Sequence, residues 1–325
     1  MNAPHATAAA LQVRAPARLH MGFVDLDGSL GRRFGSVGLT LEGLNTTLQI
    51  RPATALEVSG HDAERARRYA ATICERFNLP PARIDITGAI PSHSGLGSGT
   101  QLALAVGMAL ARLHGLKLSS RDVAGLLDRG ARSGVGIGSF DGGGFIVDGG
   151  RGALDAPPPI VAQMPFPAEW RMVLIFDHAC RGLHGAAEKE AFRVLPPYRA
   201  GLADRLSRLV LMRALPALAE RDIDMFGAAI NELQHCVGDY FAPAQGGGRY
   251  TSALVSSVAE HLAGLGAACI GQSSWGPTGF ALAASEAEAN ALVASARKRF
   301  AQAEGLELMV CAARNEGAQW TELPG

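Results

Sequence analysis

The chain has 325 residues, and its 30 Lys and Arg balance 30 Asp and Glu at a pI near 7.1. This length fits one large or two ordinary domains, and the balanced charge without a basic block argues against nucleic-acid binding and favours small-molecule partners. Five scattered cysteines form no CxxC pair, which indicates neither a zinc site nor a disulfide framework and favours the cytoplasm.

The first half of the chain predicts strands with interspersed helices. A short disordered lead-in comes first, without the basic and apolar regions of a signal peptide. Apolar and β-branched runs then predict strands at 11–23, 36–52, 55–60 and 83–90. Helical spacing predicts helices at 62–77 and, behind a Ser cap, at 119–131.

The stretch PSHSGLGSGT at 91–100 predicts an anion-binding loop at the start of a helix. Its glycines leave the main chain open to close approach, and apolar residues at helical spacing follow from Leu102 to Leu113. Unpaired N–H groups and the positive end of the helix dipole favour a phosphate there. A turn that only caps the helix is the alternative. The loop matches neither GxxxxGK[ST] nor GxGxxG.

Next comes SGVGIGSFDGGGFIVDGG at 133–150, with eight glycines in eighteen residues. So few side chains predict a close main-chain approach to a ligand or to the neighbouring loop. The Pro-rich run at 155–167 indicates a boundary, and we divide the chain into domains at 1–160 and 161–325. Residues 89–111 and 262–285 lack charged side chains, yet Gly, Pro and Ser interrupt both, so neither predicts a membrane span.

The second domain predicts a β-α-β-β-α-β order, which is that of ferredoxin-like folds. Several helical segments are expected between 186 and 265. The predicted strands lie at 170–176, 267–273, 279–285 and 306–314, with a helix at 286–301 before the last of them.

Four motifs resemble those of the GHMP kinase superfamily over most of the chain: APARLHMGF, PSHSGLGSGTQLALA, GIGSFDGGGFIVDGG and GQSSWGPTGFAL. The resemblance implies an α+β fold of two domains. The N-terminal α/β domain carries the phosphate loop, and a C-terminal ferredoxin-like domain closes a ligand cleft. A homodimer is also implied.

Two further stretches, at 17–42 and 181–192, resemble the β-ribofuranosylaminobenzene 5′-phosphate synthases of tetrahydromethanopterin biosynthesis, a branch of one-carbon metabolism. That branch implies a pentosyltransferase that joins phosphoribosyl pyrophosphate to 4-aminobenzoate through a C–C bond, releasing pyrophosphate and CO2. Mg²⁺ is expected with the pyrophosphate donor. The kinases usually carry GLGSS, whereas Gly99 and Thr100 follow Ser98 here, which favours this branch over a kinase metal site.

The resemblance also implies roles for particular residues. The donor's pyrophosphate is expected on the main chain of the loop, and the loop residues assigned to substrate binding are Ser94, Gly95, Gly97, Ser98, Gly99 and Thr100. Asp141 aligns with the cleft carboxylate of the kinases and is expected to act as base, charge stabiliser or magnesium ligand. A turn Asp that bonds its own backbone is the alternative.

Other candidates flank the loop. Arg18 and His20 lie at a strand end and suit phosphate binding or proton transfer, unless they form a buried structural pair. Arg181 is expected to bind substrate and His184 to be catalytic, because they follow the strand at 170–176 and loops at strand ends usually carry sites. An exposed charged loop is the alternative. A last group clamps the ribose phosphate or forms only a solvated hairpin: Asp25, Asp27, Arg32 and Arg33.

Two other functions fit the same motifs. An ATP-dependent small-molecule kinase of the superfamily is the first, because fold and phosphate loop alone do not fix the reaction. A non-catalytic sensor that keeps the sugar-phosphate cleft is the second. Convergence of Asp141, Arg18 and His184 on one cavity with the loop would favour an enzyme over the sensor.

Overall fold

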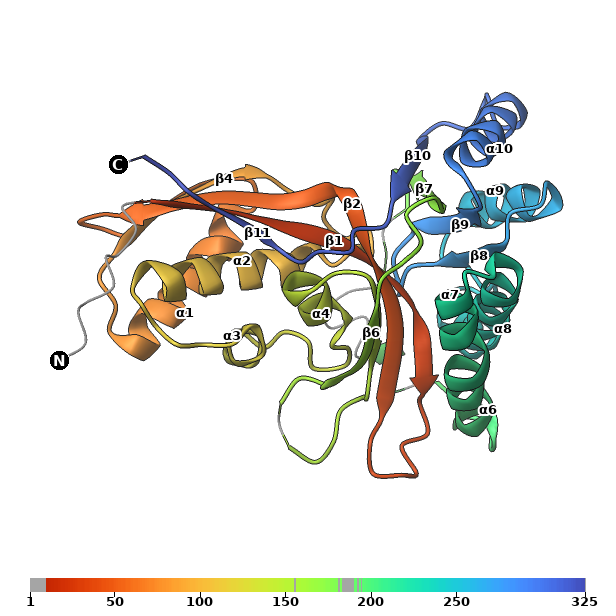
Figure 1. The fold of residues 1–325 in the computed structure, drawn as a ribbon, viewed down its shortest axis with the longest axis horizontal. Coiled ribbons are helices and arrows are strands. Elements are labelled where there is room, and N and C mark those ends of the chain that lie inside the picture. Colours follow the sequence, from red (N-terminus) through yellow and green to blue (C-terminus); the bar gives the residue numbers. More distant parts are fainter. Residues whose placement is uncertain are drawn as a thin grey trace.

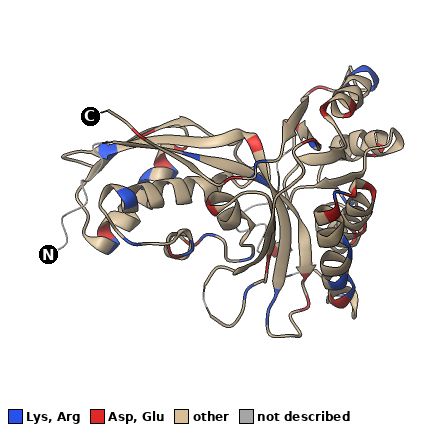
Figure 2. Cartoon of the chain, in the orientation of Figure 1, with Lys and Arg blue, Asp and Glu red and all other residues tan. Residues whose placement is uncertain are grey.

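The computed structural model describes residues 10–154, 156–180, 182, 190, 191, 193 and 195–324. Two lobes lie side by side, each with its own sheet (Figure 1). Lys and Arg alternate with Asp and Glu over both lobes (Figure 2). None of the described helices is long and apolar enough to cross a membrane, and all five cysteines are free thiols.

A seven-stranded sheet forms the N-terminal lobe. Its main path runs β11-β1-β2-β4-β3, and β5 and β6 extend it from the first half of β2. The strands are β1 Leu11–Asp25, β2 Phe34–Pro52, β3 Glu57–Gly60, β4 Ala82–Gly88, β5 Phe145–Asp148, β6 Ile160–Met164 and β11 Gln319–Glu322. Because β1 and β2 are long, they reach from the helices of this lobe to the C-terminal lobe (Figure 1).

Four helices lie on one side of this sheet (Figure 1). They are α1 Ala63–Phe77, α2 Ser98–Leu113, α3 Ser120–Leu126 and α4 Val135–Asp141. Helix α2 is the central one, and its residues from Gln101 to Val106 are all buried. A helix that is buried all round belongs to a core, so the start of α2 is held rigidly. The helix predicted after the loop is confirmed.

The C-terminal lobe has an antiparallel sheet in the order β10-β7-β9-β8. Its strands are β7 Arg171–Asp177, β8 Cys269–Gln272, β9 Gly279–Ala283 and β10 Leu306–Ala312. Its helical segments are α6 Leu202–Leu209, the π-helical turn Val210–Ala214, α7 Leu215–Glu220, α8 Ile223–Phe241, the 3-10 turn Ala242–Ala244, α9 Ala253–Gly264 and α10 Glu286–Arg299. The predicted ferredoxin-like order is confirmed.

Alternate residues of β7 pack into two different hydrophobic cores. Val173 and Ile175 pack with α9 and α10, whereas Met172 and Leu174 pack with the helices α6 to α8 and with the N-terminal sheet. This second core is continuous across the lobes, so apolar packing joins them.

The sheets divide the chain differently from the predicted boundary at residue 160. Strand β6 covers 160–164 and pairs with β5, and β11 returns to pair with β1, so both belong to the first sheet. The first lobe therefore runs to Met164, and the break falls at Pro165 and Pro167 of the Pro-rich run. The outgoing and returning segments are tied, because Phe166 N–H donates to Asn315 Oδ1 at 2.8 Å and Asn315 Nδ2 donates to the Phe166 carbonyl at 2.9 Å.

Candidate active site

The loop before α2 presents a row of main-chain N–H groups. Gly95 and Gly97 take left-handed φ angles of 84° and 86°, and Gly97 is the N-cap of α2. The N–H groups of Thr100 and Gln101 bond back to the Gly97 carbonyl. Among the described residues, the N–H groups of 95–99 have no acceptor. Together with the helix dipole, these groups form an anion-binding cradle.

A turn of the C-terminal lobe closes against this loop. It joins β8 to β9, and its Ser273 hydroxyl donates to the Gly95 carbonyl at 2.8 Å. A Cβ on Gly95 would collide with the Ser273 carbonyl, and one on Gly276 would collide with the Ser94 carbonyl. The two lobes therefore meet backbone to backbone at the loop, which only glycine permits.

Arg18, on β1, is brought to the loop as the sequence predicts. Its Nη1 donates to the Gly95 carbonyl, and its main-chain N–H donates to the Leu96 carbonyl at 3.1 Å. A Cβ on Gly97 would stand 3.3 Å from Arg18 Cγ and Cζ. The guanidinium thus lies over the N-cap of α2, where its charge favours an anion.

His20 lies two residues further along β1, at the same junction. It is only 3 % exposed, its N–H donates to Ser273 Oγ at 3.0 Å, and both ring nitrogens lack a hydrogen-bond partner in the described part of the chain. Burial, and then the charges of Arg18 and Arg132, lower the pKa of His20 to about 3. The ring is therefore neutral near pH 7 and offers one donor and one acceptor, not a positive charge.

The His20 ring lines a pocket between β1, α8 and the turn after β8. Aromatic side chains form much of its wall, namely Phe23, Phe241 and Trp275. The His20 and Phe23 rings meet edge to face at 4.5 Å, and those of Phe241 and Trp275 lie 4.2 Å apart. The pocket holds about 20 Å³, roughly the space of one water, so its walls have to move apart before an aromatic ring can enter.

Helix α4 connects Asp141 to the loop. The N-terminal end of α4 faces it, since Gln101 Nε2 donates to the Gly136 carbonyl at 2.8 Å, and Asp141 ends the helix about 7–8 Å further along its axis. Its carboxylate accepts from Ser120 Oγ at 2.6 Å. Burial raises the pKa of Asp141, and the bond from Ser120 lowers it in part.

The catalytic role of Asp141 stays a prediction, and the helix that carries this residue was not expected from the sequence. A glycine-rich stretch favours a loop, yet 135–141 are helical because their glycines let α4 pack closely: a Cβ on Gly138 would stand 2.9 Å from Ile146. The expected approach of this stretch to the loop is found at Gly136, where a Cβ would lie 3.0 Å from Thr100 Cγ2.

The other predicted residues have different outcomes. Arg181 and His184 lie outside the described residues, whereas Gly182 packs against the Trp275 carbonyl and Gly276 of the turn. Ser94 is buried, and its hydroxyl donates to the Pro91 carbonyl at 2.7 Å, which stiffens the loop. Three residues form the first turn of α2, namely Ser98, Gly99 and Thr100.

The charged hairpin between β1 and β2 is bonded to main chain. Asp25 Oδ1 accepts from the N–H groups of Asp27 and Gly28. Arg32 donates to two carbonyls of the glycine-rich segment, and Arg33 Nε donates to the Leu26 carbonyl at 3.0 Å. These contacts support the structural alternative for the hairpin.

Sequence reasoning missed two charged residues of this region. Asp148, 2 % exposed, accepts hydrogen bonds from Ser36, Ser133, and the N–H groups of Gly134 and Gly150. Asp148 fixes the turn before α4. Its position at the end of an apolar strand in the glycine-rich stretch is the feature of the sequence that could have indicated this role.

Arg65, in α1, is the second. Its Nη1 would stand 3.1 Å from a Cβ on Gly99, so the guanidinium lies against the start of α2. No local pattern marks it, because it is one of several arginines on a charged helix.

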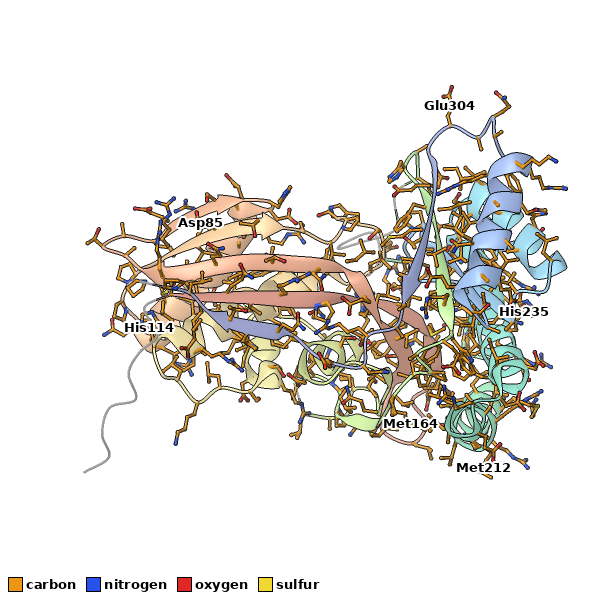
Figure 3. All side chains as sticks on the ribbon, turned by 45° about the horizontal axis from the view of Figure 1, so that its top comes forward. Asp85, His114, Met164, Met212, His235 and Glu304 are labelled. Carbon is orange, nitrogen blue, oxygen red and sulfur yellow. The ribbon has the colours of Figure 1, made fainter. Side chains whose placement is uncertain are left out.

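Among the described residues, no group of three or more His, Cys, Asp or Glu could hold a metal ion. Figure 3 shows His114 at the outer end of the N-terminal lobe and His235 on the helical side of the other lobe.

The comparisons with known proteins agree with this fold. Residues 64–147 match the GHMP kinases N terminal domain, and residues 214–302 match the GHMP kinases C terminal domain. The chain belongs to the GHMP kinase superfamily. It is 33 % identical over 326 aligned residues to the β-ribofuranosylphenol 5′-phosphate synthase of Archaeoglobus fulgidus, covering 95 % of this chain and 99 % of that protein. The enzyme of the same name from Methanothermobacter thermautotrophicus is 33 % identical over 82 % of this chain and 87 % of its own.

Solved structures share the fold at low sequence identity. Homoserine kinase from Cytophaga hutchinsonii superposes with a TM-score of 0.69 at 17 % identity, over 99 % of this chain and 100 % of its own. Mevalonate diphosphate decarboxylase from Staphylococcus aureus gives 0.68 at 16 %, over 97 % and 98 %. At such identity the likeness concerns the fold alone. The relatives above are synthases, which supports an enzymatic role and a related phosphoribosyl transfer for this chain.

Proposed function

We propose that this chain is a phosphoribosyltransferase that joins phosphoribosyl pyrophosphate to a para-substituted benzoate through a C–C bond and releases pyrophosphate and CO2. The observation that carries the proposal is the row of N–H groups at 95–99, without acceptors among the described residues and beside Arg18. Such a cradle suits a leaving group that gains negative charge as its bond breaks.

In the proposed reaction, the bond between ribose C1 and the pyrophosphate oxygen breaks with both electrons on the oxygen. The loop amides and Arg18 stabilise that charge, and an oxocarbenium-like ribose remains. The ring carbon that bears the carboxylate attacks C1. Loss of CO2 then returns the electrons of the carboxylate bond to the ring and restores aromaticity.

The para substituent must push electron density toward the attacking carbon. The motif resemblance suggests an amine, as in 4-aminobenzoate, whereas the relatives' name contains phenol and favours a hydroxyl, as in 4-hydroxybenzoate. We assign this ring to the region of the aromatic pocket after the pocket opens, and His20 to its substituent. A neutral imidazole accepts a hydrogen bond from either an N–H or an O–H, and so raises the electron density of the ring.

Magnesium enters the proposal with the donor. The described part of the chain offers no cluster of three metal-ligating side chains, and Mg²⁺ commonly binds phosphate oxygens and waters with few protein ligands. The residues thus fit an ion that arrives on the pyrophosphate. Tetrahydromethanopterin biosynthesis and a homodimer remain part of the proposal through the motif resemblance, and size-exclusion chromatography with light scattering measures the latter.

The decisive experiment supplies phosphoribosyl pyrophosphate and Mg²⁺ with carboxyl-labelled 4-aminobenzoate or 4-hydroxybenzoate. Labelled CO2 and equimolar pyrophosphate from one of them are expected. Folded protein that releases no label from either would refute the proposal. ATP with an alcohol substrate is the parallel reaction for the kinase alternative, and phosphate transfer there without a response to phosphoribosyl pyrophosphate would favour a kinase.

A further inference from the structure

Arg65 occupies a position that does not favour its own helix. It lies in the first turn of α1, where the positive end of the helix dipole opposes a cation. Its Nη2 contacts both carboxylate oxygens of Asp62, at 3.2 and 3.3 Å. The side chain is 23 % exposed. Helix stability does not explain this arginine, so its surroundings must.

Asp62 holds Arg65 toward the loop. It is a non-glycine residue with a left-handed φ of 53°, a conformation that Asp adopts more readily than most residues. Its Oδ2 also accepts from the Ser92 hydroxyl at 3.1 Å. Ser92 lies in the segment that leads into the loop, so Asp62 connects the start of α1 to that segment and orients the guanidinium.

The other end of the guanidinium rests on the start of α2. Its Nη1 would stand 3.1 Å from a Cβ on Gly99, which is closer than most Cβ atoms approach a neighbouring atom. Nη1 has no acceptor of its own in the part of the chain that the structure describes. A cationic N–H group beside free main-chain N–H groups is suited to bind an anion.

We propose that Arg65 binds the second phosphate of a pyrophosphate group, which the cradle holds between two guanidinium groups. Arg18 lies at the Gly95–Gly97 end of the row of N–H groups and Arg65 at the Gly99 end. This arrangement fits two linked phosphates better than one. The buried His20, whose ring nitrogens lack partners among the described residues, lies beside this cradle, where the proposed function has the acceptor. That the pyrophosphate belongs to the donor rests on the proposed function.

Calorimetry with inorganic pyrophosphate and magnesium tests the assignment without turnover. Arg65→Met should bind pyrophosphate at least about tenfold more weakly, the loss expected for one charge-assisted contact. The affinity for orthophosphate should fall by a smaller factor. Arg68→Met is the matched control, because Arg68 is exposed on the same helix, and it should bind like the parent. Parental affinity in Arg65→Met, or an equal loss for both anions, would overturn the assignment.

The unpaired Asp62 carboxylate could by itself repel the anion in Arg65→Met. The double variant Asp62→Asn/Arg65→Met removes both charges and should remain weak. Recovery of parental affinity would show that Arg65 does not bind the anion. Arg65→Lys keeps a charge and provides a folded variant if the methionine variant is unstable, and it should bind more weakly than the parent because lysine lacks the two-pronged geometry.

A double-mutant cycle with Gly99 separates direct contact from general electrostatics. Gly99→Ala should push the guanidinium away and weaken pyrophosphate binding in the parent, yet change it little in the Arg65→Met background. Equal effects in both backgrounds would contradict the contact. A parent that binds pyrophosphate through Arg65 but releases no CO2 would refute only the proposed reaction. A parent that reacts while Arg65→Met binds pyrophosphate normally would refute only this inference.

Discussion

Replacing Gly97 by alanine tests whether the loop binds an anion or only caps α2. The new Cβ would lie 3.3 Å from Arg18 Cγ and Cζ and 3.4 Å from Nε, so the guanidinium has to shift and weaken its bond to the Gly95 carbonyl. One charge-assisted contact contributes about 1.5–3 kcal/mol, which corresponds to a loss of roughly 10- to 150-fold in anion affinity. The left-handed φ of 86° adds about 1–2 kcal/mol of strain to the folded state.

Gly115 provides the matched control for that strain. It follows the other end of α2 with a φ of +68°, and a Cβ there would meet nothing within 4 Å. Gly115→Ala should therefore lose similar stability by urea denaturation but keep the parental affinity for pyrophosphate in calorimetry. If Gly97→Ala also bound like the parent, the loop would be a helix cap and the anion site would lie elsewhere.

The remaining predictions concern three titratable residues. Because the pKa of His20 is about 3 in the folded state and about 6.5 when unfolded, the unfolded chain takes up the extra proton, and folding should lose about 2 kcal/mol between pH 8 and pH 5. His20→Gln should remove this part of the pH dependence in urea titrations, and an unchanged slope would contradict a buried neutral ring. Asp148→Asn should destabilise the fold by about 2–3 kcal/mol, because an amide cannot accept all the hydrogen bonds of the carboxylate; a loss below about 1 kcal/mol would show that the turn before α4 is held otherwise. Asp141→Asn should leave turnover close to parental, since this residue lies at the far end of α4, whereas a loss of about a hundredfold, as for a general acid or base, would return it to the catalytic site.

The sequence was informative where structure is decided locally. The loop and α2 follow from glycines and from apolar spacing between Leu102 and Leu113, and the strand and helix periods of the C-terminal lobe lead to its observed order. Both patterns involve neighbours a few residues apart. The start of α3 is also decided locally, because Ser119 and Asp122 form a complete capping box there.

Sequence was less informative where packing decides. Helix α4 forms despite its glycines, because Gly136 and Gly138 fit against Thr100 and Ile146 from other elements. That packing also sets Asp141 at the C-terminal end of this helix. Arg65 reaches Gly99 from a separate helix, and no spacing within the chain encodes such a contact. Charged groups brought together by the fold are the part of this site that only a structure reveals.

During synthesis on the ribosome, β1 emerges long before its neighbour β11. The two strands pair from Leu11 with Glu322 to Arg14 with Gln319, so this edge of β1 stays open until residues 319–322 have been made, and open strand edges invite aggregation. The same strand carries Arg18 and His20, and the Ser273 hydroxyl bonds both to the His20 N–H and to the Gly95 carbonyl of the loop. A nascent chain that stops before residue 273 therefore lacks a closed cradle and should bind the anion more weakly than a chain that includes this turn.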